Sequence, residues 1–306
     1  MTDQLKLMFV LAHPDDESLG NGGTIAKYAA EGVEICLVVA TRGEKGWFSD
    51  PSEYPGAAEL GRIREEELRS AAAVLGIQEV SFLDYVDGEF DKADPQEAVS
   101  KIAAQIRRVQ PQVVVTFDQN GLYGHPDHIA VCQFTTSAVA AAADPTFEDA
   151  DRQAEHSVSK LYYMAWTQDD VDLYERAFGD LVMEIDGQER RSFPWPEWSI
   201  TTVIDAKDHW RTAWEAISHH RTQLPGYEKL LALPESDHVG MWGKHLYYRV
   251  FTMVPVRSKV ESDLFEGLRG QQRPADRQGS SQREQDDGGN WLVSEIRRIA
   301  APLPAS

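Results

Sequence analysis

The chain has 306 residues, of which 42% are hydrophobic, and it carries 50 acidic against 30 basic residues for a formal net charge of -20. This length and apolar content support a globular protein with a real core, and the acidic balance argues against a nucleic-acid partner, because duplex binding depends on Lys and Arg neutralising phosphates. The N-terminus has neither a basic segment with a long apolar core nor a stretch long enough to span a bilayer, so we expect a cytoplasmic protein without membrane insertion.

The first predicted strand leads directly into residues with metal-binding chemistry. Residues 7–12 are apolar, and His13-Pro14-Asp15-Asp16-Glu17 follow them. The loop at the carboxyl end of a strand is the usual position of the functional site in an open α/β sheet. The two aspartates could equally be the N-terminal charges of the next helix, a role that is compatible with metal binding.

A glycine-rich helix start and a second strand complete a βαβ unit. Gly20-Asn21-Gly22-Gly23 opens a helix predicted to reach residue 31, and residues 34–40 form the second strand of a parallel sheet with a right-handed crossover. The glycines lack the G-x-G-x-x-G spacing of a dinucleotide site, and the preceding carboxylates would repel a pyrophosphate. We therefore expect no nucleotide cofactor, and interpret the glycines as allowing the helix start to pack close to the preceding loop.

The next elements continue the alternation of helix and strand. Residues 42–61 read as a long loop whose aromatic side chains either form a substrate lid or plug the core. A helix over 62–75, a strand over 80–83, a helix over 95–109 and a strand over 113–117 follow. This order predicts an α/β fold with a Rossmann-like, mostly parallel sheet and helices on both faces.

A second polar cluster follows the strand at 113–117, in the run Tyr123-Gly124-His125-Pro126-Asp127-His128. Pro126 suits the first turn of a helix predicted over 126–143, which places both histidines on one face. A His-x-x-His pair alone is more often a surface or capping feature. Catalytic zinc, however, takes three protein ligands and keeps one position open; His13, Asp16 and His128 would supply that set, and Asp15 would remain free as general base.

At these residues the sequence resembles the LmbE-like, or PIG-L, family of zinc-dependent N-deacetylases that act on N-acetylglucosamine-type substrates. Both family motifs, Ala-His-Pro-Asp-Asp-Glu and Gly-His-Pro-Asp-His, occur here unchanged at 12–17 and 124–128. The resemblance implies zinc, with Fe2+ as the alternative ion. It also implies roles for further residues: His125 polarises the carbonyl or protonates the leaving amine, Asp127 orients His125, and Tyr123 lies near the reacting carbonyl.

The resemblance extends to two less specific elements. Arg64 and Glu67 fit an Arg-x-x-Glu-Leu element, and His219-His220-Arg221-Thr222-Gln223 resembles a His-x-Ser-Gln element in which Thr222 replaces serine. Arg64, Glu67 and His220 would then contact substrate. The alternatives are a solvated ion pair between Arg64 and Glu67, and for His220 a position at the negative end of a helix.

The second half of the chain carries fewer signals. We expect a loop over 144–155, a strand over 160–165, a helix over 207–220 and a strand over 245–254. The aromatic segment 192–198, with Trp195 and Trp198, either lines a sugar-binding groove or packs against the protein. Cys36 and Cys132 form neither a disulfide nor a metal framework and are predicted to be core thiols.

The domain organisation follows from composition. Residues 1–268 form the enzyme domain, 269–290 are too polar to build a core and form a linker, and 291–306 give a short amphipathic segment. That segment docks on its own domain or on a neighbouring subunit, which leaves a homo-oligomer open.

The predicted function is removal of an N-acetyl group from an N-acetylglucosamine-type derivative, a small-molecule amidated sugar, by metal-activated water. One alternative is an amidase that acts on a sugar-thiol conjugate with the same residues. Another is a non-catalytic metal-binding protein, which would have no need of Asp15 and His125.

Overall fold

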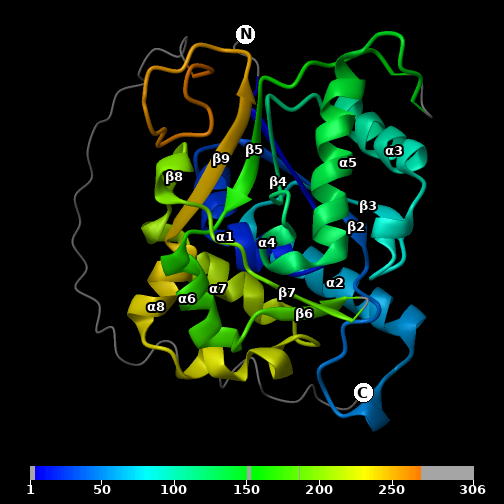
Figure 1. Cartoon of the computed structure of the whole chain (residues 1–306), viewed down its shortest axis with the longest axis vertical. Coiled ribbons are helices and arrows are strands. Elements are labelled where there is room, and N and C mark those ends of the chain that lie inside the picture. The colour runs from blue at the N-terminus through cyan, green and yellow to red at the C-terminus, as the bar shows by residue number, and fades with distance from the viewer. Residues whose placement is uncertain (1–3, 150–152, 186, 270–306) are drawn as a thin grey trace. The chain divides into compact units, whose positions relative to one another are not determined.

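A seven-stranded sheet in the order β3-β2-β1-β4-β5-β9-β8 organises the described residues (Figure 1). The computed structural model describes residues 4–149, 153–185 and 187–269. A separate hairpin, β6-β7, lies outside the main sheet. The strands are β1 (Lys6–Leu11), β2 (Glu34–Thr41), β3 (Glu79–Tyr85), β4 (Val113–Thr116), β5 (Lys160–Ala165), β6 (Val182–Ile185), β7 (Gln188–Arg191), β8 (Thr202–Asp205) and β9 (Lys244–Thr252).

The strand directions confirm the predicted mostly parallel sheet. Strands β3, β2, β1, β4 and β5 are parallel, whereas β9 runs antiparallel to β5 and β8 antiparallel to β9. Strand β1 has β2 on one side and β4 on the other, so the strand order reverses direction between β1 and β4. Ligands of open α/β sheets bind at the carboxyl ends of strands at this reversal.

Helices cover both faces of the sheet (Figure 1). Helix α1 packs with α2 and α7, and α3 packs with α5. The α-helices are α1 (Asp16–Ala30), α2 (Ala57–Leu75), α3 (Pro95–Val109), α4 (Gly121–Gly124), α5 (Pro126–Ala143), α6 (Gln168–Phe178), α7 (Trp210–His219) and α8 (Glu235–Trp242). Short 3-10 segments are η1 (Pro51–Glu53), η2 (Phe90–Lys92), η3 (Glu197–Ser199), η4 (Lys207–His209) and η5 (Leu224–Ala232).

The core forms where the sheet is covered on both sides. Strand β1 is buried along its length after Lys6, as expected for an apolar strand with helices on each face. On α1, a Cβ at Gly23 would collide with the carbonyl of Trp242, and one at Gly22 would press on Ala213. The glycines therefore serve close packing against α7 and α8 rather than against the loop before α1. Cys36 and Cys132 are free and buried, as predicted.

Two helices begin several residues earlier than predicted. Helix α1 begins at Asp16 rather than at Gly20, because the Asp15 carbonyl already accepts the amide of Leu19 at 2.9 Å. Helix α2 begins at Ala57, which shortens the loop predicted over 42–61. Helix α6, the β6-β7 hairpin, η5 and α8 were not predicted.

No helix among the described residues is both long and apolar enough to cross a bilayer. The predicted linker and amphipathic segment at 269–306 lie outside the described residues, apart from Arg269.

Candidate metal centre and active site

The first motif loop, residues 12–17, folds back on itself at the end of β1. The Asp16 carboxylate accepts the backbone amides of His13 at 2.7 Å and of Ala12 at 3.2 Å. This local ring of hydrogen bonds holds the carboxylate beside the His13 imidazole, with 3.6 Å between Asp16 Oδ2 and His13 Nδ1.

The second motif loop, residues 118–128, places a histidine in the first turn of α5. His125 caps the helix, since its Nδ1 accepts the Asp127 backbone amide at 3.2 Å. His128 lies one turn further and stacks on Phe117 with 3.9 Å between ring centroids. Because β1 and β4 are neighbours, the two motif loops meet at one edge of the sheet.

Three side chains from these loops converge in a geometry that fits a metal ion. His13 Nδ1 lies 3.3 Å from His128 Nε2, and His128 Nε2 lies 3.5 Å from Asp16 Oδ1. Two ligands that each lie about 2.1 Å from a tetrahedral ion are separated by roughly 3.4 Å, so His13, Asp16 and His128 have the spacing of a ligand set. His13 and His128 are buried and Asp16 is half-buried. The donor atoms are two imidazole nitrogens and one carboxylate oxygen.

The ionisation of His128 and Asp16 agrees with a cation site. Burial lowers the pKa of His128 to about 3, so its imidazole is neutral at pH 7. Although burial opposes it, His128 and His13 hold the pKa of Asp16 well below its usual range. A neutral imidazole and an ionised carboxylate are the forms that bind metal. Although burial opposes it, hydrogen bonds to Asp127, Asp16 and Asp87 raise the pKa of His13 well above its usual value, so metal binding there releases a proton.

The other nitrogen of His13 is held by two carboxylates. His13 Nε2 lies 3.1 Å from Asp87 Oδ1 and 3.2 Å from Asp127 Oδ2. Asp127 also accepts the backbone amides of Gly88 and Phe90. Such carboxylate contacts fix the tautomer and orientation of a metal-binding histidine.

This arrangement differs from the expectation that Asp127 orients His125. The Asp127 carboxylate contacts His13 instead. The group of Asp127 that pairs with His125 is its backbone amide. Asp87 was not predicted as a site residue. Its position just after β3, at the same sheet edge as the two motif loops, could have indicated it.

Asp15 stands beside the ligand set in a conformation that is rare for its residue type. Its φ is 115°, in the left-handed region. Its Oδ2 accepts hydrogen bonds from Tyr227 OH at 2.7 Å and from Arg64 Nη2 at 3.2 Å. Burial raises the pKa of Asp15 to about 6, against the opposing charge of Arg64.

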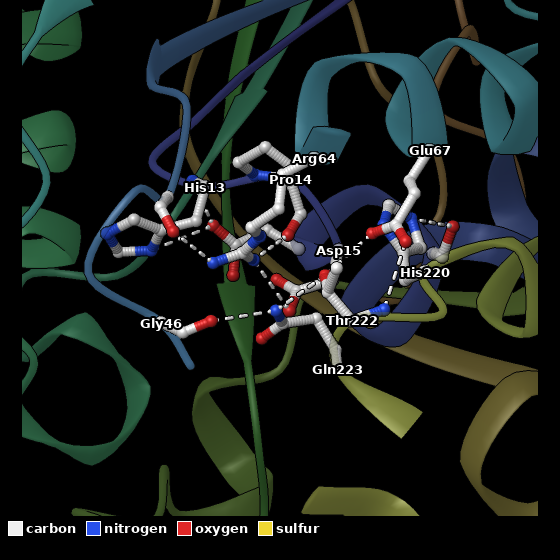
Figure 2. A network of polar contacts seen from close by, with 12 residues as sticks. His13, Pro14, Asp15, Gly46, Arg64, Glu67, His220, Thr222 and Gln223 are labelled. Carbon is white, nitrogen blue, oxygen red and sulfur yellow. Dashed lines mark hydrogen bonds and ion pairs between the residues drawn. The ribbon is translucent and has the colours of Figure 1, made fainter. Parts of the chain in front are cut away.

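The three residues expected to contact substrate have different environments (Figure 2). Arg64 lines the cavity at the metal site and donates to the carbonyls of Pro14 and Gly43. Glu67 and His220 do not line it: Glu67 accepts Thr222, and His220 Nε2 lies 2.8 Å from Glu17 Oε1. Glu67 and His220 therefore connect segments of the chain and do not line the cavity. Arg64 pairs with Asp15 rather than with Glu67.

Tyr123 reaches the cavity from a strained turn. Gly121 and Leu122 both have positive φ, at 62° and 63°, and the Asp118 carboxylate supports the turn by accepting the Leu122 amide at 2.7 Å. The Tyr123 ring contacts His128 edge to face, at 5.3 Å between centroids. Tyr123 and His125 both line the cavity beside the ligand set.

The cavity has a volume of about 460 Å³ and two chemically distinct sides. Its polar floor carries the motif residues, together with Asp87 and Arg64. A second group of lining residues, which we call the apolar wall, comes from the end of β5, α6 and β6 and consists of Trp166, Tyr174, Phe178, Leu181, Val182 and Met183. Phe48, from the loop before α2, also lines the cavity rather than plugging the core, and it is 57% exposed.

The aromatic segment at 192–198 does not line this cavity. Trp195 packs on Tyr248 and donates its indole N–H to Asp118 Oδ2 at 2.8 Å. Trp198 is 87% exposed. Trp195 therefore packs against the protein, as one of the two predicted alternatives has it, and its indole N–H holds the second motif loop.

Comparisons with known proteins identify relatives that cover most of this chain. Residues 8–139 match PIG-L, described as GlcNAc-PI de-N-acetylase. The chain is 34% identical over 295 residues to 1D-myo-inositol 2-acetamido-2-deoxy-alpha-D-glucopyranoside deacetylase of Geodermatophilus obscurus, covering 88% of this chain and 100% of that protein. It is 30% identical over 292 residues to mycothiol S-conjugate amidase of Streptomyces coelicolor, covering 88% and 99%.

Solved structures share the fold. N,N'-diacetylchitobiose deacetylase from Pyrococcus horikoshii matches with a TM-score of 0.61 and 22% identity, over 81% of this chain and 84% of that one.

Proposed function

The chain belongs to the PIG-L family, and from this premise we propose that it is a metal-dependent hydrolase that removes the acetyl group from the nitrogen of an N-acetylglucosamine-type sugar derivative. One observation carries the proposal: three metal-ligand atoms converge on the floor of a cavity that Asp15 also lines. A binding protein without activity needs only the ligands, whereas here Tyr123 and His125 also line that cavity.

Zinc is the ion that the donor set supports best, held by His13, Asp16 and His128. Catalytic zinc sites combine histidine nitrogen with carboxylate oxygen and keep a position open. Fe2+ accepts the same donors and is the alternative. When bound, the ion would polarise the amide carbonyl and lower the pKa of a water molecule towards neutrality.

Asp15 is the general base in this proposal. Its Oδ2 is occupied by Tyr227 and Arg64, whereas Oδ1 has no hydrogen-bond partner among the described residues. Oδ1 takes a proton from the water as the water oxygen bonds to the carbonyl carbon. The same proton passes to the nitrogen as the C–N bond breaks, which yields a free amine and acetic acid, and the acid releases its proton to solvent to give acetate.

His125 and Tyr123 supply hydrogen bonds to the amide oxygen. Because His125 Nδ1 accepts the Asp127 amide, the ring proton is on Nε2. Burial lowers the pKa of His125 to about 4, so it acts as a neutral donor at pH 7 rather than as an acid toward the amine. Burial raises the pKa of Tyr123, which keeps its hydroxyl protonated. Donors fixed in this way stabilise the charge that develops on the oxygen.

A second candidate is hydrolysis of the amide in a sugar-thiol conjugate, and the apolar wall favours it. Sugar rings can stack on aromatic faces, but this wall also carries aliphatic side chains such as Leu181 and Val182, which offer no hydrogen-bond partner to a hydroxyl. An apolar group carried on the sulfur of a conjugate would leave water on binding there.

Acetate release tests the main proposal. Purified protein is loaded with Zn2+ and incubated with a panel of N-acetylglucosamine derivatives, with and without a chelator. Release that the chelator abolishes supports the deacetylase. Cleavage confined to thiol conjugates supports the amidase, and no cleavage of any member of either class would overturn both.

A further inference from the structure

Four side chains of the segment 220–227, which follows α7 and enters η5, contact residues at or beside the cavity, and three of them, His220, Thr222 and Gln223, are labelled in Figure 2. These residues lie outside residues 8–139, the span that the family model matches. The contacts are His220 to Glu17, Thr222 to Glu67, Gln223 to the Gly46 carbonyl at 3.0 Å, and Tyr227 to Asp15.

Tyr227 is the member of this segment that touches the base. Its hydroxyl donates to Asp15 Oδ2 at 2.7 Å. Its ring is buried and packs edge to face on Phe178, with 5.4 Å between centroids. Packing of the buried ring therefore fixes the position of the hydroxyl group.

The left-handed backbone of Asp15 is held within its own loop, because the Asp15 amide donates to Glu17 Oε2 at 3.0 Å. The Asp15 side chain depends on partners outside that loop. Its carboxylate has hydrogen bonds only to Tyr227 and Arg64 among the described residues, and both bind the same oxygen. Two donors on Oδ2 fix the rotation of the carboxylate and leave Oδ1 for the reaction.

The two donors are not equivalent. The Arg64 guanidinium is also committed to the carbonyls of Pro14 and Gly43, and its contact with Asp15 is the longer, at 3.2 Å. Burial raises the pKa of Tyr227 well above its usual range, so its hydroxyl stays a donor. Arg64 places a positive charge beside the Asp15 carboxylate, whereas the Tyr227 hydroxyl fixes the orientation of that carboxylate.

We propose that Tyr227 is a positioning residue, whose hydroxyl holds the Asp15 carboxylate by Oδ2 so that Oδ1 faces the amide. This inference rests on the proposed function for its catalytic consequence, but the contact itself can be tested without substrate.

Substituting Tyr227→Phe removes the hydroxyl and keeps the packed ring. We expect kcat to fall about ten- to hundredfold, the range for a hydrogen bond to a charged group, with KM and bound metal unchanged. Tyr247→Phe is the control, because it removes another buried hydroxyl, which donates to Asn21 on α1 outside this cavity. An unchanged kcat, or a rise in KM alone, would overturn the assignment.

A double-mutant cycle separates positioning from general damage. In an Asp15→Asn background the Tyr227→Phe change should alter the residual rate by less than about twofold, because its effect acts through Asp15. A loss as large as in the wild-type background would show that Tyr227 acts independently of Asp15.

A spectroscopic readout remains valid even if no substrate is turned over. Protein labelled at the aspartate side-chain carboxyl carbon gives an NMR signal for Asp15, assigned by its disappearance in Asp15→Asn. Tyr227→Phe should shift that signal and Tyr247→Phe should not. A signal unmoved by Tyr227→Phe overturns the contact, whereas a shifted signal in a protein that cleaves no sugar amide leaves the contact standing and refutes the proposed function.

Discussion

The carboxylate of Asp127 lies 3.2 Å from Nε2 of His13, on the side of the imidazole opposite the nitrogen that faces Asp16 and His128. This contact connects the second motif to a ligand in the first. It fixes which His13 nitrogen carries the proton, and leaves Nδ1 free for metal.

Replacing Asp127 by Asn should therefore weaken metal binding. The loss of a charged partner behind a ligating histidine costs about 10- to 100-fold in affinity. Zn2+ titration by calorimetry, with a competing chelator if binding is tight, measures the effect. Asp94→Asn is the control, since Asp94 caps α3 and does not line the cavity. Equal affinities for the wild type and Asp127→Asn would contradict the prediction.

Substitutions of Asp15 and His128 should distinguish the loss of the general base from the loss of the metal. Asp15→Ala is expected to keep the metal and lose turnover by about 100-fold or more, the contribution of a general base. His128→Ala removes a ligand and should lose both. Metal content by elemental analysis and kcat on the same samples provide the comparison. An Asp15→Ala enzyme with undiminished kcat refutes its role as base.

The apolar wall should affect KM only for substrates that reach it, whereas kcat can change for every substrate because Phe178 also packs on Tyr227. Phe178→Ala is expected to raise KM about tenfold for derivatives that carry an aromatic or alkyl group, the scale of a lost apolar contact. It should leave the KM of N-acetylglucosamine itself unchanged. Equal effects on the KM of both kinds of substrate would show that Phe178 supports the fold of the wall rather than contacting an apolar group.

Stability should depend on a buried ion pair far from the cavity. Lys160 Nζ lies 2.6 Å from Glu261 Oε1, and both side chains are fully buried. Tyr162 and Thr202 also donate to Glu261. Glu261→Gln leaves the Lys160 charge uncompensated and should lower the free energy of unfolding by about 3–5 kcal/mol.

Urea denaturation measures the change, with Glu89→Ala as the control. Glu89 pairs with Lys45 at the surface, where such pairs contribute little, so its denaturation midpoint should not move. Similar midpoints for the wild type and Glu261→Gln would contradict the prediction.

His245 should make the protein sensitive to acid. Burial lowers the pKa of His245 to about 3, whereas the unfolded chain has a histidine pKa of about 6.5. Between these values the unfolded state binds the extra proton, so stability is full above pH 6.5 and declines as the pH falls towards 3. At pH 5 the loss from this residue is about 2 kcal/mol.

Thermal unfolding between pH 7 and pH 5 tests the role of His245. His245→Gln keeps an acceptor for Thr24, which lies 2.7 Å from His245 Nδ1, and it should flatten the decline in melting temperature. A slope identical to that of the wild type would show that other groups cause the acid sensitivity.

Much of the fold could be predicted because its signals are local. Apolar strands such as β1 and β4 are buried on both faces, and such strands appear as continuous apolar runs in the sequence. The β6-β7 hairpin escaped prediction because its four-residue strands are only partly buried and carry no alternating pattern.

The sequence by itself determined the candidate ligands, because His13 and Asp16 lie three residues apart in one loop, and His125 and His128 lie one helical turn apart. Tertiary structure alone decided what surrounds them. Asp87 and Tyr227 reach His13 and Asp15 from segments 74 and 212 residues away along the chain, and Glu67 and His220 turn out to lie behind the cavity wall. Spacing along a chain specifies which side chains share a loop or helix face, but only the tertiary structure, with Asp87 after β3 and Tyr227 in η5, brings these distant groups within hydrogen-bonding distance.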